Sequence, residues 1–477
     1  MPLTERSATW LARAIREGET SAREVIEAHI ALLERVQPVV NAVVADCFEA
    51  ARDRADLADQ VVAAGGPELP PLLGVPFTVK ESIAVAGLPH TAGVVARRNH
   101  RATETAPVVR RMLDAGAIPL ALTNTSELCM WIETENRLYG RTSNPYDAER
   151  TAGGSSGGEG AAVGSGGAPF GLGTDTGGSI RMPAFCCGVF GHKPSPGLVP
   201  LTGAFPLPRG ETARLTANGP LARRAEDLMP LLRILAGPDG EDPHCRPDPR
   251  TGQPPLGDPG EVRLDGLRVL ITEHAWLGPI SRELLAARER AAAVLETLGA
   301  RVEHMSLRTA RLMIEPYLAI LSKGGSLHDL LRAEGSDVRW RATLTRGGEH
   351  TRATKALLLA EPLTSLAPWT RTGAALAAGL GFARSFAETV GDAVVLHPPA
   401  PTVAPRHGRT IGRPYWPQPM GLFNLAGLPA TQVPLGLNDR GLPLGVQVAA
   451  GPNRDHVTIR VALELERAFG GWFPPGV

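Results

Sequence analysis

Residues 151–181 read TAGGSSGGEGAAVGSGGAPFGLGTDTGGSIR, a run of small residues in which two serines, Ser155 and Ser179, each follow consecutive glycines. The second half predicts an apolar strand ending near Gly173, then a glycine turn, then a helix beginning at Ser179. Because the first N–H groups of a helix have no intrahelical acceptor, such a turn gathers unpaired donors in one concavity that favours an anion. The segment therefore predicts a site where negative charge is stabilised.

If Ser179 is a nucleophile, the carbonyl oxygen that it attacks becomes an oxyanion among these donors. They are the backbone N–H groups of Thr176, Gly177, Gly178 and Ser179 itself. One such donor is typically worth roughly 3 to 4 kcal/mol of the barrier. The alternative is a glycine-rich turn whose serine only caps the helix, and this segment alone leaves both open.

Lysine is rare in this chain, and its positions are therefore informative. The chain has 49 Lys+Arg, and the four lysines are Lys80, Lys193, Lys323 and Lys355, which leaves 45 arginines (49 − 4). Arginine stays protonated in proteins, whereas a buried lysine can become a neutral base. Lys80 follows the apolar run LLGVPFTV (72–79), so a strand there would deliver its amine to a buried edge. Lys323 and Lys355 stand in polar surroundings, which favours chance retention.

Composition bounds the class of function. With 477 residues and 43% hydrophobic content the chain can bury a large core, and 49 acidic against 49 basic residues leave no footprint for nucleic acid or an acidic membrane surface. The longest weakly polar run, 373–383, is far shorter than the roughly 20 residues that span a bilayer. The N-terminus lacks the pattern of a signal peptide. Five cysteines, odd in number and without CxxC, predict reduced thiols, a cytoplasmic location and no metal site.

Helix and strand patterns alternate along the chain. Ser21 and Glu24 form a capping box that opens an amphipathic helix. The predicted helices are 21–36, 106–115 and 281–298, and the predicted strands are 118–122, 267–271 and 301–304. This alternation predicts an α/β fold with a central mixed, mostly parallel β-sheet covered by helices.

The chain is interpreted as one large domain, 1–477, with a catalytic core at about 70–235. Residues 237–260 contain seven prolines and are predicted to form an irregular surface excursion. Residues 306–390 are predicted to be largely helical, with a role that the sequence does not declare.

One tempting motif has the wrong context. Residues 153–157 satisfy G-x-S-x-G, the nucleophile elbow of α/β-hydrolases. That elbow needs a strand directly before it, and residues 144–150 predict a turn. None of the 12 histidines stands out as its partner. For GGSSGG taken alone, a flexible linker remains the alternative.

The joint arrangement is more specific than its parts. Lys80, Ser155 and Ser179, spaced by 75 and 24 residues, resemble the amidase signature family, whose members use a Ser-Ser-Lys triad in place of Ser-His-Asp. The likeness covers nearly the whole chain and is closest to the fatty-acid amide hydrolases, particularly the second type. The matching segments are GVPFTVKES, TNTSELCMW, GRTSNPYD, GGSSGGEG, GTDTGGSIRMPAF, GHKPSPG, PTVAP, NLAGLPATQVPLG and GLPLGVQVAAGP.

The resemblance implies a role for each matching residue. It makes Ser179 the nucleophile, Ser155 the bridging serine and Lys80 the base. The oxyanion hole is assigned to Thr176, Gly177 and Gly178. Support of the loop is assigned to Ser156, Asp175 and Arg181. The wall of the substrate site is assigned to Cys129, Met130 and Trp131. An ordinary ion pair in a turn is the alternative for Asp175 with Arg181. Lys193, in GHKPSPG, is interpreted as structural.

In such a triad Lys80 takes a proton from Ser155 and Ser155 takes one from Ser179, so Lys80 must be neutral when the substrate binds. Lowering a lysine pKa from about 10.4 to the range of about 7 to 8 that suits a general base corresponds to roughly 4 kcal/mol, which burial can supply.

The expected activity is hydrolysis of a carboxylic amide through a serine acyl-enzyme, without metal or organic cofactor, and an apolar acyl or aryl amide is favoured. The alternatives are an esterase with the same triad and one subunit of a glutamine-dependent amidotransferase. The expected partners are a small-molecule amide and, in one possibility, a second copy in a homodimer; no nucleic acid and no transmembrane anchor are expected.

Overall fold

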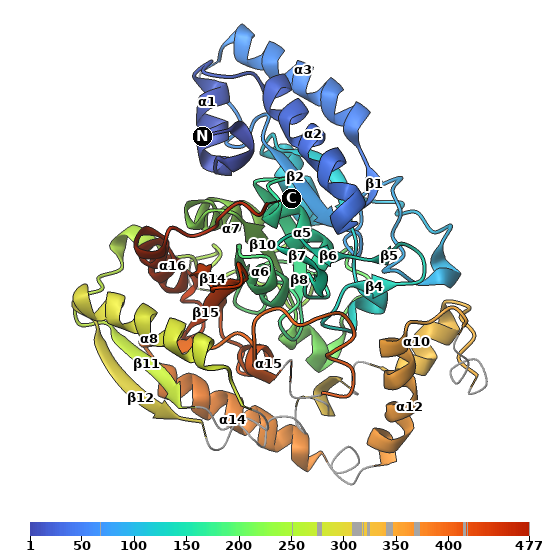
Figure 1. Cartoon of the computed structure of the whole chain (residues 1–477), viewed down its shortest axis with the longest axis vertical. Helices are drawn as coiled ribbons and strands as arrows, with labels where there is room; N and C mark the ends of the chain where they lie inside the picture. Colours follow the sequence, from blue (N-terminus) through green and yellow to red (C-terminus); the bar gives the residue numbers. More distant parts are fainter. Residues whose placement is uncertain are drawn as a thin grey trace.

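A computed structural model describes most of the chain (Figure 1). The described residues are 1–66, 68–249, 251–273, 279–307, 317, 319–321, 325–339, 347–366, 373–413, 416 and 418–476. Lys323 lies outside them.

An eleven-stranded sheet forms the centre of the described part, in the order β1-β3-β2-β8-β10-β9-β14-β15-β13-β11-β12. Its strands are β1 (Val43–Asp46), β2 (Pro76–Lys80), β3 (Ile118–Thr123), β8 (Phe170–Asp175), β9 (Phe190–Lys193), β10 (Ala217–Ala222), β11 (Arg268–Glu273), β12 (Arg301–Ser306), β13 (Val394–His397), β14 (Ala430–Leu437) and β15 (Pro443–Ala450). The predicted single large α/β domain with a mixed sheet is confirmed.

The expectation of a mostly parallel sheet is wrong. The parallel pairs are β2/β3, β2/β8, β11/β12 and β11/β13. The antiparallel pairs are β1/β3, β8/β10, β9/β10, β9/β14, β14/β15 and β13/β15. Uniform burial explains the error: every residue of β8, β10 and β15 is buried, so their apolar runs look like parallel strands whichever way the neighbours point.

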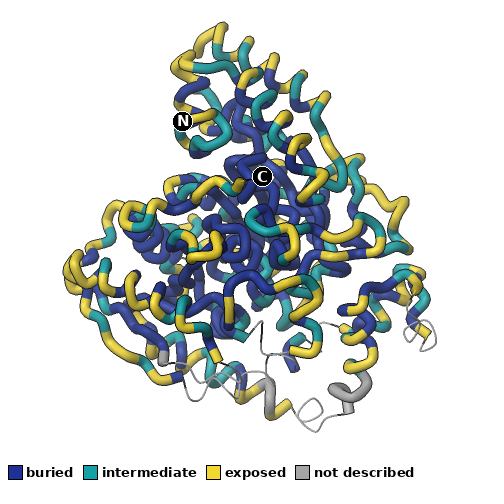
Figure 2. Tube along the Cα trace, in the orientation of Figure 1, coloured by how far each residue is buried: buried dark blue, intermediate teal, exposed yellow. Residues whose placement is uncertain are grey.

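Helices pack on the sheet in two groups. One group contains α5 and α6, which contact each other and the central strands. The other group contains α4, α7, α16 and α8, in which α7 contacts α4 and α16, and α16 contacts α8. The helices are α1 (Ala8–Arg16), α2 (Ala22–Val40), α3 (Phe48–Ala64), α4 (Pro107–Asp114), α5 (Gly157–Gly164), α6 (Arg181–Cys186), α7 (Leu228–Leu235), α8 (Arg282–Thr297), α10 (Leu327–Ala333), α12 (Arg352–Leu366), α14 (Ala374–Val390), α15 (Gln418–Leu425) and α16 (Asp455–Phe469). Figure 2 shows the buried segments gathered around these central strands.

The predicted local elements are present with small shifts at their ends. The capping box forms, because Ser21 accepts from the Glu24 N–H and Glu24 accepts from the Ser21 N–H. The other predicted helices appear as α4 and α8, and the predicted strands as β3, β11 and β12. The apolar run 72–79 becomes strand only from Pro76, since residues 71–74 form a turn that ends at Gly74 with φ +78°.

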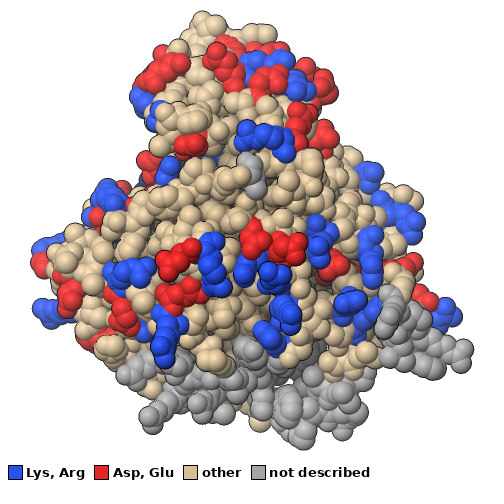
Figure 3. Space-filling model, viewed as in Figure 1, with Lys and Arg blue, Asp and Glu red and all other residues tan. Residues whose placement is uncertain are grey.

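The outlying regions also follow their composition. The described residues of 237–260 are irregular apart from the start of the short 3-10 helix η6 (Pro259–Glu261). The described parts of 306–390 are mainly the helices α10, α12 and α14. Among the described residues no helix is long and apolar enough to cross a bilayer. On the face drawn in Figure 3, basic and acidic side chains are interspersed.

The pairing of β2 with β8 positions the site. The two strands are parallel, with Val79 opposite Leu172, so their carboxyl ends meet at the same edge of the sheet. Lys80 closes β2, and Thr174 and Asp175 close β8. Both serine-containing loops, 153–156 and 176–180, lie next to these strand ends in the hydrogen-bond network described below. This is where ligands bind in open α/β sheets.

Glycine permits the close approach of α5 to the strand ends, and this approach can be tested. A Cβ at Gly158 would overlap the backbone nitrogen and oxygen of Asn124 and lie 2.9 Å from its Cα. Backbone atoms cannot move aside as a flexible side chain can. We expect Gly158→Ala to lower the free energy of unfolding by about 1 to 3 kcal/mol or more.

A matched variant separates this clash from helix propensity. Gly381 lies inside α14, and a Cβ at this position would have no described atom within 4 Å apart from the backbone of its own helix. Gly381→Ala should therefore raise stability by about 0.5 to 1 kcal/mol. Urea or thermal unfolding measures both, and equal effects of the two variants would contradict the packing described for α5.

Candidate active site

Lys80 is fully buried and makes two short contacts. Its Nζ lies 2.7 Å from Ser155 Oγ and 2.7 Å from Thr174 Oγ1. Ser155 comes from the loop before α5, and Thr174 comes from β8. Two of the predicted site residues are therefore in direct contact, together with a threonine that the sequence analysis did not assign.

Burial lowers the pKa of the Lys80 amine. The Cys129 thiol and the carboxyl groups of Asp175 and Glu159 act in the opposite direction on this pKa, but burial dominates. The protein therefore favours the neutral amine more than water does, which is the form that a proton acceptor needs.

Glu159 is a second buried titratable group beside Lys80. Thr78 Oγ1 lies 2.6 Å from its Oε2, and Thr123 Oγ1 lies 2.6 Å from its Oε1. A Cβ at Gly171 would overlap the carboxyl group, so only glycine leaves room for it there. Burial raises the pKa of Glu159 to about 8. Burial therefore favours the protonated, uncharged form of this carboxyl group.

The two serine loops are joined through their main chains. The Ser156 N–H donates to the Ser179 carbonyl at 3.2 Å, and Ser156 Oγ donates to the Thr174 carbonyl at 3.4 Å. Ser155 is buried, whereas Ser179 is partly exposed. The structure records no hydrogen bond of the Ser179 hydroxyl to any described residue. Lys80 and Ser155 are thus in contact, while among the described residues Ser179 is joined to the Ser155 loop through its backbone carbonyl.

The Ser179 loop differs from its prediction in two respects. The helix begins at Arg181, with Ile180 as its N-cap, so Ser179 lies in a turn before it. The Gly178 N–H was expected to face an oxyanion. It donates instead to Asp175 Oδ1 at 2.8 Å. The N–H groups of Thr176, Gly177 and Ser179 have no recorded acceptor among the described residues.

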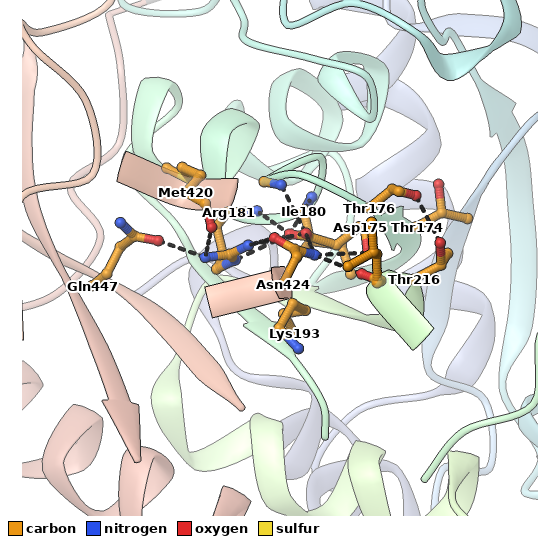
Figure 4. Close-up of polar contacts among 12 residues, drawn as sticks. Thr174, Asp175, Thr176, Ile180, Arg181, Lys193, Thr216, Met420, Asn424 and Gln447 are labelled. Atoms are coloured by element: carbon orange, nitrogen blue, oxygen red, sulfur yellow. Dashed lines mark hydrogen bonds and ion pairs between the residues drawn. The ribbon is translucent and has the colours of Figure 1, made fainter. Parts of the chain in front are cut away.

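Asp175 and Arg181 form a buried clamp under this loop (Figure 4). Arg181 donates from Nε to Asp175 Oδ2 at 3.1 Å and from Nη2 to Oδ1 at 3.0 Å. Asp175 also accepts from the Ile180 N–H at 3.1 Å. Burial alone would raise the pKa of Asp175, but the Arg181 charge and its hydrogen bonds hold that pKa well below the usual value. The ion pair is more than an ordinary surface turn, because both side chains are fully buried.

The C-terminal part of the chain completes the clamp. Asn424 in α15 donates to Asp175 Oδ1 at 2.9 Å and accepts from Arg181 at 2.5 Å. Arg181 also donates to Gln447 Oε1 at 2.7 Å and to the Met420 carbonyl at 3.1 Å. Asn424 and Gln447 lie in NLAGLPATQVPLG and GLPLGVQVAAGP, segments that matched the family, but the sequence analysis assigned no role to them.

The predicted substrate wall follows β3. Cys129 ends the 3-10 helix η3 (Glu127–Cys129), and its Sγ lies 3.3 Å from Thr125 Oγ1. Met130 is 42% exposed, and Trp131 donates from Nε1 to Thr410 Oγ1 at 3.0 Å. Thr125 Oγ1 also donates to the Ser155 carbonyl at 3.0 Å, which joins this loop to the Ser155 loop.

The other described lysines lie apart from this contact. Lys193 is fully buried and donates to the Pro194 carbonyl at 2.8 Å; burial lowers its pKa to about 7. In Figure 4 its amine points away from the Asp175–Arg181 pair. Lys355 donates to the Gly347 carbonyl.

Two further features correct or complement the expectations. Residues 144–150, predicted as a turn, belong to a hairpin of β6 (Ser143–Asn144) and β7 (Asp147–Thr151).

A cavity of about 510 Å³ lies elsewhere, between the loop after β9, the 3-10 helix η4 (Gly210–Leu215) and α14. None of the predicted site residues lines it, so the contacts of Lys80, and not cavity size, define the candidate site.

Comparisons with known proteins identify the family. The family model Amidase matches residues 24–459. Fatty-acid amide hydrolase 2-B of Danio rerio is 41% identical over 100% of this chain and 92% of its own length, and an acylamidase of Rhodococcus erythropolis is 34% identical over 96% and 94%. The solved structure of 6-aminohexanoate cyclic dimer hydrolase in complex with substrate has a TM-score of 0.81 and 27% identity and covers 98% of this chain and 97% of its own. The chain therefore belongs to the amidase signature family and is a hydrolase that acts on amides.

Proposed function

We propose that this hydrolase uses Ser179 as its nucleophile, Ser155 as a proton bridge and Lys80 as the base. The observation that carries the proposal is the buried 2.7 Å contact between Lys80 Nζ and Ser155 Oγ, next to a loop that presents a partly exposed serine. A buried amine with a lowered pKa is suited to take a proton from a hydroxyl, which an arginine is not.

The proton moves in two steps. Lys80 takes the Ser155 proton, and Ser155 takes the Ser179 proton as Ser179 Oγ attacks the amide carbonyl carbon. The second step requires the Ser179 hydroxyl to turn toward Ser155, since catalytic hydrogen bonds often form fully only with substrate bound. The return of the same proton to the amide nitrogen makes the amine a leaving group. Water, activated along the same path, then releases the acid from the acyl-enzyme.

The oxyanion hole is proposed to consist of the N–H groups of Thr176, Gly177 and Ser179. Gly178 has a different part: its N–H donates to Asp175 and so fixes the shape of the loop. Donors that are already aimed at the developing charge need no reorganisation during the reaction, which is why such preorganised donors lower the barrier.

The substrate is proposed to be an amide with an apolar acyl or aryl part. The similarity to fatty-acid amide hydrolase 2-B supports an apolar acyl group. The proposed wall of Cys129, Met130 and Trp131 would suit such a group, because Met130 exposes an apolar side chain in the loop after β3.

The role of Lys80 is tested by two substitutions. Lys80→Arg should abolish activity nearly as completely as Lys80→Ala, since guanidinium cannot lose its proton. In the unmodified enzyme, kcat/KM should rise with pH through the Lys80 pKa, which lies below the ordinary value of about 10.4 because of burial. A Lys80→Arg enzyme with mild impairment would contradict a neutral base.

The nucleophile is tested by covalent labelling. A fluorophosphonate should modify Ser179 alone, as peptide mass spectrometry after proteolysis would reveal. Ser179→Ala should remove both labelling and hydrolysis, and Ser165→Ala, in a serine at the end of α5 that bonds to the Ala162 carbonyl, serves as the control. Labelling at any other serine overturns the assignment.

The acyl preference is tested with amides of increasing acyl length, aryl amides and a matched ester, by assay of the released amine or alcohol. We expect kcat/KM for the amides to rise from acetamide to longer or aryl acyl groups. A preference for acetamide over all longer chains would sink the apolar-acyl proposal. Negligible activity on every amide, with a second protein co-eluting in size-exclusion chromatography of the native enzyme, would instead favour the amidotransferase alternative.

A further inference from the structure

Tyr317 reaches the Ser179 loop from a part of the chain that carried no assigned role. Its hydroxyl donates to the Thr176 carbonyl at 3.2 Å. A Cβ at Gly177 would overlap this hydroxyl, and a Cβ at Gly421 in α15 would lie 3.8 Å from the Tyr317 ring. The phenol therefore lies between α15 and the Thr176–Gly177 peptide.

This hydrogen bond orients one particular peptide group. In a trans peptide the carbonyl and the following N–H point in opposite directions. Because Tyr317 holds the Thr176 carbonyl, the Gly177 N–H is turned away from Tyr317, and no described residue accepts from it. Thr176 Oγ1 also lies 3.0 Å from Thr216 Oγ1, which restrains the same residue from its side chain.

We propose that Tyr317 is a positioning residue that fixes the Thr176–Gly177 peptide so that the Gly177 N–H faces the carbonyl oxygen of the substrate in the transition state. The inference rests on the proposed function, since it assigns a purpose to the oxyanion loop of that site. It also gives the helical region 306–390 a first defined contribution to the chemistry.

The chemistry of the phenol suits this role. Burial and the nearby Asp175 carboxylate raise the pKa of Tyr317 above its usual value, so the hydroxyl keeps its proton and remains a donor throughout the working pH range. The clamp beneath the loop sets the Gly178 N–H, whereas Tyr317 sets the preceding peptide. The two restraints act on different bonds of the same loop and do not replace each other.

The test is Tyr317→Phe, which keeps the ring and removes the donor. We expect kcat for an amide to fall about 3- to 10-fold, as the loss of one neutral hydrogen bond implies, with KM within about twofold of the original value. The affinity for a boronic acid that mimics the tetrahedral state should fall in parallel with kcat, while the unfolding temperature changes little.

Tyr146→Phe is the matched control. Tyr146 also donates its hydroxyl to a backbone carbonyl, that of Phe473 at 2.5 Å, but this contact lies outside the site. The control should therefore leave kcat, KM and boronic acid affinity unchanged.

The outcomes are distinguishable from failure of the proposed function. An unchanged kcat in Tyr317→Phe overturns the inference, as does a raised KM with unchanged kcat, which would make Tyr317 a wall of the substrate site. If Tyr317→Phe does not fold, Tyr317→Met, which also removes the donor and leaves the oxyanion loop unchanged in sequence, decides in the same assay. Hydrolysis that persists in Ser179→Ala would refute the nucleophile assignment, whatever the Tyr317 variants do.

Discussion

The Asp175 carboxylate is the point on which the site depends. One carboxylate accepts hydrogen bonds from two N–H groups of the Ser179 loop, from the Arg181 guanidinium and from the Asn424 amide. Every one of these partners is buried with it, so the loss of any member would leave unpaired charge or unpaired donors in a medium that solvates them poorly. The shape of the Ser179 loop is thus a consequence of satisfying one buried negative charge.

A second constraint concerns which buried groups carry charge. Asp175 is held ionised by Arg181, whereas Glu159 accepts hydrogen bonds from two threonine hydroxyls among the described residues, and burial favours its protonated form. Lys80 lies under the influence of both carboxyl groups. The Arg181 guanidinium already compensates the Asp175 carboxylate, and burial favours the protonated form of Glu159, so both effects weaken the need for the lysine amine as a counter-ion. The same burial can therefore leave it uncharged.

Much of this could be predicted from the sequence, and the reasons for the remainder are physical. The rarity of lysine, together with the resemblance, pointed to Lys80 and Ser155, and their contact is present. Strand direction was out of reach, because an apolar run records burial and not the orientation of a neighbour. The use of the Gly178 N–H by Asp175 was missed, since a glycine nest does not reveal which of its donors are already paired. Tyr317 belongs to no matching segment and is found only through its contact with Thr176.

The distance along the chain between the parts of the clamp affects when the site can exist. Asp175 and Arg181 leave the ribosome long before Asn424 and Gln447, which occupy α15 and β15 near the end of the chain. A nascent polypeptide that stops short of α15 has a Ser179 loop whose charged anchor lacks its amide partners. The candidate site is therefore fully assembled only after α15 and β15 have been synthesised, and an unfinished chain carries this loop without its complete support.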